Sequence, residues 1–78
     1  MVDLKRVLTD ITKVIVDSPD EVNVTGKTRG NNVMLELHVA EDDMGKVIGR
    51  HGKIARSIRL VMKAAASTVG KTVNVEIK

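Results

Sequence analysis

Two glycines three residues apart, Gly49 and Gly52, enclose two residues that can bind an anion, Arg50 and His51. Glycine has no Cβ, so the backbone at these positions can approach a ligand closely. A long segment with helical periodicity follows, and the N-terminus of a helix presents unpaired N–H groups and a positive dipole end. The pattern therefore predicts a loop that clamps the phosphate backbone of a single-stranded nucleic acid.

Other phosphate-binding motifs do not fit the chain. Gly26-Lys27-Thr28 matches the end of a Walker A loop, but Glu21 stands where its first glycine is required. A dinucleotide-binding fingerprint around Gly49 and Gly52 fails as well, because Val47 occupies the place of its first glycine. The sequence therefore predicts neither a Walker A loop nor a dinucleotide-binding loop.

Catalytic and metal sites also lack the necessary residues. Asp42 and Asp43 are explained by their position at the start of a predicted helix, and His38 has no partner at a metal-ligand spacing. No Ser–His–Asp or Cys–His set is visible, and the chain has no cysteine. We therefore expect no enzymatic activity, no metal, no cofactor and no small-molecule substrate.

The composition of the 78 residues predicts one small domain, spanning residues 1–78, with an aliphatic core. The absence of Phe, Tyr and Trp excludes recognition modes that stack bases on aromatic platforms, and it excludes methyl-lysine cages. Charged residues interrupt the N-terminal apolar positions too often for a signal peptide or a membrane span. We therefore expect a cytoplasmic protein with no membrane contact.

The charge is unevenly distributed along the chain. Residues 1–43 contain nine acidic and five basic residues, whereas residues 44–75 contain seven basic residues and no acidic one. Such asymmetry favours a polyanionic partner, although a solvent-exposed basic helix face would give the same pattern.

Hydrophobic periodicity predicts six elements. A helix over 4–15, with Asp3 as N-cap, ends before Ser18-Pro19. A short strand over 21–25, a loop over 26–32 and a strand over 33–40 follow. An acidic N-cap and first turn at 41–43 then begin a short helix that runs through Ile48, and the last two elements are the longest helix, from 53 onward, and a strand over 72–77.

The longest helix has an apolar face and a basic face. Its predicted buried stripe is Ile54, Ile58, Val61, Met62, Ala65 and Val69, and its predicted basic ridge is Lys53, Arg56, Arg59 and Lys63. The predicted fold is α+β: a three-stranded mixed sheet with three helices covering one face, because each strand has a single apolar face.

The element order and the segment Ile48-Gly49-Arg50-His51-Gly52-Lys53-Ile54 resemble the KH domain, whose signature is V-I-G-x-x-G. The resemblance extends over nearly the whole chain. Segments 17–22, 44–49 and 62–66 look like those of the small stand-alone bacterial KH proteins of the KhpA type.

The resemblance implies single-stranded RNA as the partner, with a G-x-x-G loop that clamps the backbone of roughly four nucleotides. Ile48 and Ile54, with Val47 or Val39, would form an apolar groove floor for the bases. Backbone groups of the strand over 35–39 would read base edges. The implied contact residues are Lys46, Val47, Ile48, Gly49, Arg50, His51, Gly52, Lys53, Ile54 and Arg56.

Two alternatives stay open at this point. The resemblance also implies a module that forms a homodimer, or a heterodimer with a larger KH protein of the Jag/EloR type, with roles in RNA chaperoning or in control of cell elongation and division. A DNA-reading helix-turn-helix is less favoured, because the second helix would begin with Lys53-Ile54-Ala55 and place an apolar residue at the groove-facing start.

Overall fold

The computed structural model describes residues 3–78, and its elements follow the predicted order. The helices are α1 (Leu4–Lys13), α2 (Met44–Ile48) and α3 (Lys53–Ser67), and the strands are β1 (Asn23–Arg29), β2 (Asn32–His38) and β3 (Thr72–Ile77). Short 3₁₀ turns at Pro19–Glu21, Glu41–Asp43 and Arg50–Gly52 connect them. The α+β class and the helix-strand-strand-helix-helix-strand order are confirmed.

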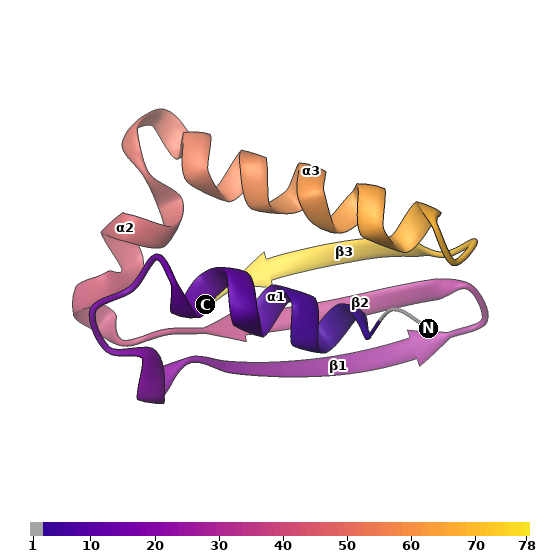
Figure 1. The fold of residues 1–78 in the computed structure, drawn as a ribbon, viewed down its shortest axis with the longest axis horizontal. Coiled ribbons are helices and arrows are strands. Elements are labelled where there is room, and N and C mark those ends of the chain that lie inside the picture. Colours follow the sequence, from indigo (N-terminus) through magenta and orange to yellow (C-terminus); the bar gives the residue numbers. More distant parts are fainter. Residues whose placement is uncertain (1–2) are drawn as a thin grey trace.

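The sheet has the strand order β1-β2-β3, with β1 and β2 antiparallel and β2 and β3 parallel, so it is mixed as predicted. Figure 1 shows α1 lying along β1 and β2, α3 lying along β3, and α2 at one end of the sheet. The prediction that three helices cover one face therefore holds for α1 and α3, whereas the five residues of α2 lie at the end of that layer.

The core lies between the sheet and the two long helices. Its fully buried side chains include Leu8 from α1, Leu37 from β2, Val47 from α2 and Met62 from α3. Each strand contributes alternate residues, because successive side chains point to opposite faces of a sheet. No helix within residues 3–78 has the length and hydropathy required to span a membrane.

The first helix ends earlier than its sequence pattern suggested. Asp3 caps α1 as predicted, accepting a hydrogen bond from the backbone N–H of Arg6. The helix stops at Lys13, however, although its apolar periodicity extends to residue 15, and Val14 is 85% exposed. Beyond Lys13 the N–H groups of Ile15 and Val16 both donate to the carbonyl of Thr12, so the chain turns before Pro19 and Val16 joins the core.

The first strand is longer than predicted. Residues 26–29, expected in a loop, continue β1, and a two-residue turn at Gly30-Asn31 joins β1 to β2. Lys27 and Arg29 point away from the helices, so their charge does not oppose strand formation. Backbone pairing with β2 stabilises this part of the strand although its side chains are polar.

The buried stripe of α3 is rotated relative to the prediction. Ala55, Ile58, Met62 and Ala66 are buried, whereas Ile54 and Val61 are exposed. Both sets have helical spacing, so periodicity alone does not separate them. Small Ala55 and Ala66 face the sheet because α3 packs closely on β3.

Candidate nucleic-acid interface

The loop between α2 and α3 has the backbone geometry that the two glycines predicted. Gly49 adopts φ 74° and ψ 173°, a region that is essentially restricted to glycine, and Gly52 is left-handed with φ 72°. The N–H of Gly49 donates to the carbonyl of Gly45 at 2.8 Å, and that of Gly52 donates to the carbonyl of Gly49 at 3.1 Å. The loop is thus a defined turn that leads directly into α3.

Gly49 is also required for packing. A Cβ at this position would lie 2.8 Å from Ile54 Cβ, and it would come still closer to Ile54 Cγ1. At Gly52, by contrast, a Cβ would meet no atom within 4 Å. Gly49 therefore allows the loop to pack against the first turn of α3. Gly52 is required only for its left-handed backbone conformation, and it lies beside open solvent.

His51 is a further special position in the loop. It is the one non-glycine residue with positive φ in the described part of the chain, with φ 58° and ψ 24°. This left-handed conformation costs an L-residue roughly 1–2 kcal/mol. The positive φ turns the backbone between the two glycines. The side chain is exposed, so the imidazole is presented to solvent.

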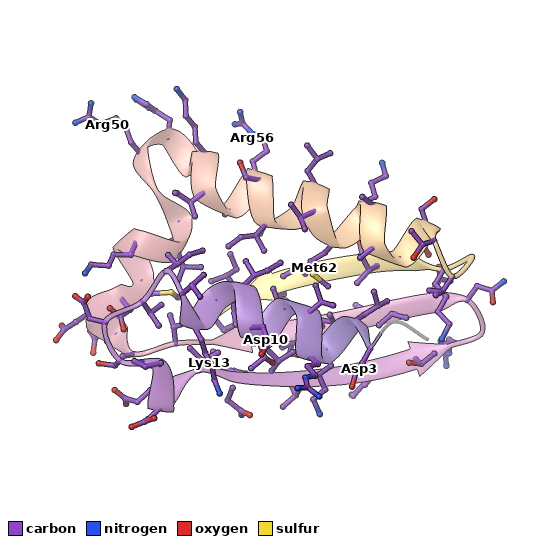
Figure 2. All side chains as sticks on the ribbon, viewed as in Figure 1. Asp3, Asp10, Lys13, Arg50, Arg56 and Met62 are labelled. Atoms are coloured by element: carbon purple, nitrogen blue, oxygen red, sulfur yellow. The ribbon has the colours of Figure 1, made fainter. Side chains whose placement is uncertain are left out.

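The cations around the loop are exposed and available to an anion. Arg50, Lys53 and Arg56 are exposed, and Figure 2 shows Arg50 and Arg56 projecting outward from the same edge of the molecule. The ion pairs within residues 3–78 involve none of these three side chains. They form a positive rim on the predicted clamp.

The aliphatic residues predicted as a groove floor separate into two groups. Ile48 and Ile54 are 42% and 38% exposed and lie on either side of the loop, so both can meet a base. Val47 is fully buried in the core, and Val39 packs against that core. Val47 therefore supports α2 from within and has no surface to offer a ligand in this conformation.

The prediction that the backbone of β2 reads base edges is wrong. Leu35 and Leu37 lie on β2, the central strand, and their backbone groups face partners in β1 and β3 on both sides. The free backbone edge on the α3 side belongs to β3. Arg59, from the predicted basic ridge of α3, donates from Nε to the carbonyl of Val75 at 3.2 Å, so it lies against that edge.

Lys46 has an acidic partner within the protein. Its Nζ forms an ion pair with the carboxylate of Asp17, and this hydrogen bond is the main cause of a raised pKa for Lys46. Burial acts in the opposite direction, and the charges of Asp17 and Asp43 add to the increase in pKa. The positive charge of Lys46 is thus largely compensated by Asp17, whereas the charges of Arg50, Lys53 and Arg56 are not paired in this way.

Asp43 has a structural role that the sequence did not reveal. Its side chain does not cap α2; it is 2% exposed and accepts hydrogen bonds from the backbone N–H groups of Asp17, at 3.1 Å, and Ser18, at 3.0 Å. The carboxylate therefore joins the connection after α1 to the start of α2. No local signal distinguishes Asp43 from the exposed Asp42, because both partners lie 25 or more residues away.

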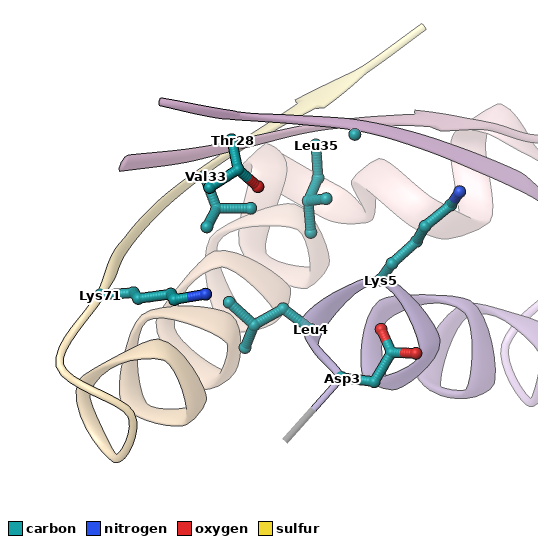
Figure 3. Close-up of a pocket in the computed structure, with 8 residues that line it drawn as sticks. Asp3, Leu4, Lys5, Thr28, Val33, Leu35 and Lys71 are labelled. Carbon is teal, nitrogen blue, oxygen red and sulfur yellow. The ribbon is translucent and has the colours of Figure 1, made fainter. Parts of the chain in front are cut away.

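The structure also shows where the other candidate side chains and the pocket beside α1 lie. Within residues 3–78, no three His, Asp or Glu side chains lie close enough together to hold a metal ion. His38 is half-buried on the open face of the sheet, 3.8 Å from Glu36. The pocket in Figure 3, of about 250 Å³, lies between α1 and the sheet and is lined by Lys5 and Lys71 among others, but by none of the predicted contact residues.

The exposed side of α3 carries a second feature. Leu60 and Val61 are 69% and 49% exposed, although both are large and apolar. This α3 apolar surface (Leu60 and Val61) is distinct from the buried stripe that faces the sheet.

Comparison with known proteins places the chain in a family. The model of a family described as KhpA/KhpB, KH domain, matches residues 5–77. The chain is 53% identical over 74 residues to the RNA-binding protein KhpA of Clostridium acetobutylicum, and the match covers 95% of this chain and 99% of that one.

Two further relatives carry the same name. The chain is 46% identical over 74 residues to the RNA-binding protein KhpA of Clostridium perfringens, covering 95% of this chain and 99% of that protein. It is 49% identical over 67 residues to the RNA-binding protein KhpA of Caldanaerobacter subterraneus subsp. tengcongensis, covering 86% and 89%. No solved structure matches the chain significantly.

Proposed function

The chain belongs to the KhpA/KhpB family of KH domains, and on this premise we propose that it binds single-stranded RNA through the loop between α2 and α3. The family is non-enzymatic, so the function is one of binding. The relatives named above are called RNA-binding proteins, and this supports the same class of partner here.

The observation that carries the proposal is the combination of a glycine-dependent backbone with unpaired cations. Gly49 brings the chain into a conformation that other residues avoid, and Arg50, Lys53 and Arg56 surround it with no acidic partner among residues 3–78. A phosphate approaching this loop meets the exposed cations, and the absence of a Cβ at Gly52 leaves the backbone accessible. Gly49, Arg50, His51, Gly52 and Lys53 form the clamp of the proposal.

The bases would lie beside the clamp, on Ile48 and Ile54. Their partial exposure provides an apolar surface without aromatic rings. Base edges would then meet the free edge of β3, where Arg59 already lies against Val75. Phosphate contacts would thus fix the position of the strand, and contacts at β3 would discriminate between bases.

The direct test replaces the two residues between the glycines. Arg50→Asp with His51→Asp should abolish binding of a short single-stranded RNA in fluorescence anisotropy and leave the circular dichroism spectrum unchanged, because both side chains are exposed. Arg6→Asp with Val14→Asp is a control of equal charge change on exposed positions of α1, and it should retain most of the affinity. Unchanged affinity in the Arg50/His51 variant would refute the clamp.

A second candidate function, self-association, is favoured by the α3 apolar surface. Large exposed aliphatic side chains on the solvent side of a helix are typical of an interaction surface, and a two-fold dimer would bury the same residues on both copies. Two linked grooves would also raise affinity for a long RNA by avidity. Sedimentation equilibrium over a range of protein concentrations tests this proposal, which a monomer at high micromolar concentration would contradict.

The remaining expectations from the family resemblance are part of the same proposal. They are a cytoplasmic location, a role as an RNA chaperone or post-transcriptional regulator, and a heterodimer with a larger KH protein in control of cell elongation and division. Sequencing of RNA crosslinked to the protein in cells, compared between wild type and the Arg50/His51 variant, tests the RNA-related part. Affinity purification of the wild type and of the Arg50/His51 variant from cells tests whether a larger KH protein is bound.

A further inference from the structure

The face of the sheet opposite α1 and α3 has one positively charged half. Residues that point to this open face form rows across the strands, set by the register of the sheet. The two rows next to the β1–β2 turn are Arg29–Asn32–Thr72 and Lys27–Met34–Asn74. They contain two cations, three uncharged polar side chains, one methionine and no acid; we call them the hairpin patch.

The cations of the hairpin patch have no acidic partner in the part of the chain that the structure describes. Lys27 and Arg29 are exposed, and the ion pairs within residues 3–78 do not include them. The next row, Thr25–Glu36–Glu76, is acidic, and Glu36 is partly compensated there by Lys78 at 3.5 Å. The sheet face therefore changes sign along its length, and only the half near the turn attracts an anion.

The same half is hollowed and has an apolar centre. A depression of about 750 Å³ is lined by Lys27, Thr28, Arg29, Asn32, Met34 and Asn74. Met34 is 56% exposed, between the cations of β1 and the amide of Asn74 on β3. An adaptable thioether side chain offers an apolar contact to a flat group without fixing its orientation.

We propose that the hairpin patch is a second contact surface for single-stranded RNA, separate from the loop between α2 and α3. Lys27 and Arg29 would bind phosphates along β1, Met34 would contact the face of a base, and Asn32 and Asn74 would hydrogen-bond base edges or ribose hydroxyls. In the row Lys27–Met34–Asn74, the order from a cation to an apolar contact to an amide matches a strand with phosphates on one side and bases on the other. An acidic peptide would use the cations, but its carboxylate side chains have no flat ring to lie on Met34 as a nucleobase does.

This inference rests on the proposed RNA binding, but it uses a different part of the molecule. The β1–β2 turn and the loop between α2 and α3 lie at opposite ends of a molecule 34 Å long (Figure 1). An RNA that covers only the clamp, roughly four nucleotides, would not reach both surfaces. A strand several times longer, or a second strand, would.

The test compares a short and a long single-stranded RNA of the same repeated sequence in fluorescence anisotropy. Lys27→Glu with Arg29→Glu should weaken binding of the long RNA about tenfold and reduce its salt slope by about 1.4, the value for two single-strand phosphate contacts. Binding of the short RNA should not change. Arg6→Glu with Lys13→Glu, on exposed positions of α1, carries the same change in charge and should leave both affinities nearly unchanged.

A second measurement uses the wild-type protein and so does not depend on folding of a variant. Ultraviolet crosslinking to the long RNA, followed by peptide mass spectrometry, should yield adducts within residues 27–34 in addition to those near residues 49–54. If adducts appear only near 49–54 and the Lys27/Arg29 variant binds the long RNA as wild type does, the hairpin patch is not an RNA surface. In a competition experiment, polyglutamate and polyuridylate can each be added to the complex with the long RNA. If both displace the RNA from this patch equally well, the patch favours an acidic protein partner and the proposal fails.

The two proposals fail in different ways. If the short RNA does not bind to the wild type at all, the clamp is wrong, whatever the hairpin patch does. If the short RNA binds and depends on Arg50 and His51, while the Lys27/Arg29 variant changes nothing, only the second surface is refuted.

Discussion

The carboxylate of Asp43 accepts the backbone N–H of Ser18 at 3.0 Å, across 25 residues of sequence. Its other oxygen accepts the N–H of Asp17, so one buried side chain satisfies two consecutive amides. Lys46, one turn further along the chain, binds the side chain of Asp17. The connection after α1 is thereby fixed to the short helix that carries the glycine loop.

Replacing Asp43 should destabilise the fold. Asp43→Ala leaves two part-buried backbone N–H groups without their acceptor, and the loss of such hydrogen bonds costs about 1–3 kcal/mol in total. Urea unfolding followed by circular dichroism should show a lower midpoint. Asp42→Ala, at the exposed neighbouring position, is the matched control and should change stability by no more than about 0.5 kcal/mol. Equal effects of the two substitutions would contradict the role assigned to Asp43.

Three glycines near the loop should respond differently to alanine. Gly49→Ala combines an unfavourable φ with overlap against Ile54, so we expect the largest loss of thermal stability and an altered loop. Gly52→Ala pays only for its positive φ, about 1–2 kcal/mol. Gly45→Ala lies inside α2 with no atom near the added Cβ, and it should stabilise the protein by up to about 1 kcal/mol.

The order of the three melting temperatures is the decisive result. We expect Gly45→Ala above wild type, Gly52→Ala below it and Gly49→Ala lowest. A Gly49→Ala variant as stable as Gly52→Ala would mean that the close packing between the loop and Ile54 is not required.

Binding of short RNA should depend on salt with a shallow slope. A clamp on roughly four nucleotides predicts a slope of log K against log salt of about −2 to −3, since each single-strand phosphate contributes about −0.7. Fluorescence anisotropy at several salt concentrations measures this value. Affinity independent of salt would exclude a clamp that depends on Arg50, Lys53 and Arg56.

The Lys46–Asp17 pair predicts a defined response at alkaline pH. The hydrogen bond to Asp17 raises the pKa of Lys46 in the folded state, so its contribution to stability is complete below the ordinary lysine pKa. It is lost only as the pH rises through the raised value. The difference in unfolding free energy between wild type and Asp17→Asn should therefore be constant from about pH 7 to pH 9 and shrink above about pH 10.4. A difference that changes between pH 7 and pH 9 would contradict this assignment.

The α3 apolar surface gives a prediction for self-association. Leu60→Glu should shift sedimentation equilibrium toward the monomer and leave the thermal stability of the monomer nearly unchanged, because the side chain is 69% exposed. Val14→Glu is the control at another exposed aliphatic residue and should leave the oligomeric state unaltered. If both variants associate as wild type does, α3 is not the dimer surface.

The proposed RNA site was predictable from the sequence to the extent that it is local. The loop from Gly49 to Gly52 and the cations beside it are adjacent in the chain, and the order of helices and strands followed from periodicity and turn residues. In α3, two sets of residues have equally good helical spacing, and the prediction of which set is buried was partly wrong. Ile54 and Val61 are exposed because α3 packs on the sheet through the smaller Ala55 and Ala66.

Sequence alone thus determined the fold class, the glycine loop, the concentration of positive charge after residue 43 and the absence of any residue set suited to catalysis, because each is a property of local spacing or composition. The tertiary structure decided that β2 is central and leaves β3 as the accessible edge, that Asp43 is a buried acceptor and Asp42 is not, and that Lys27 and Arg29 share a sheet face with Met34. These relationships join residues far apart in the chain. They follow from strand order, register and helix rotation, which only the packing of the whole core determines.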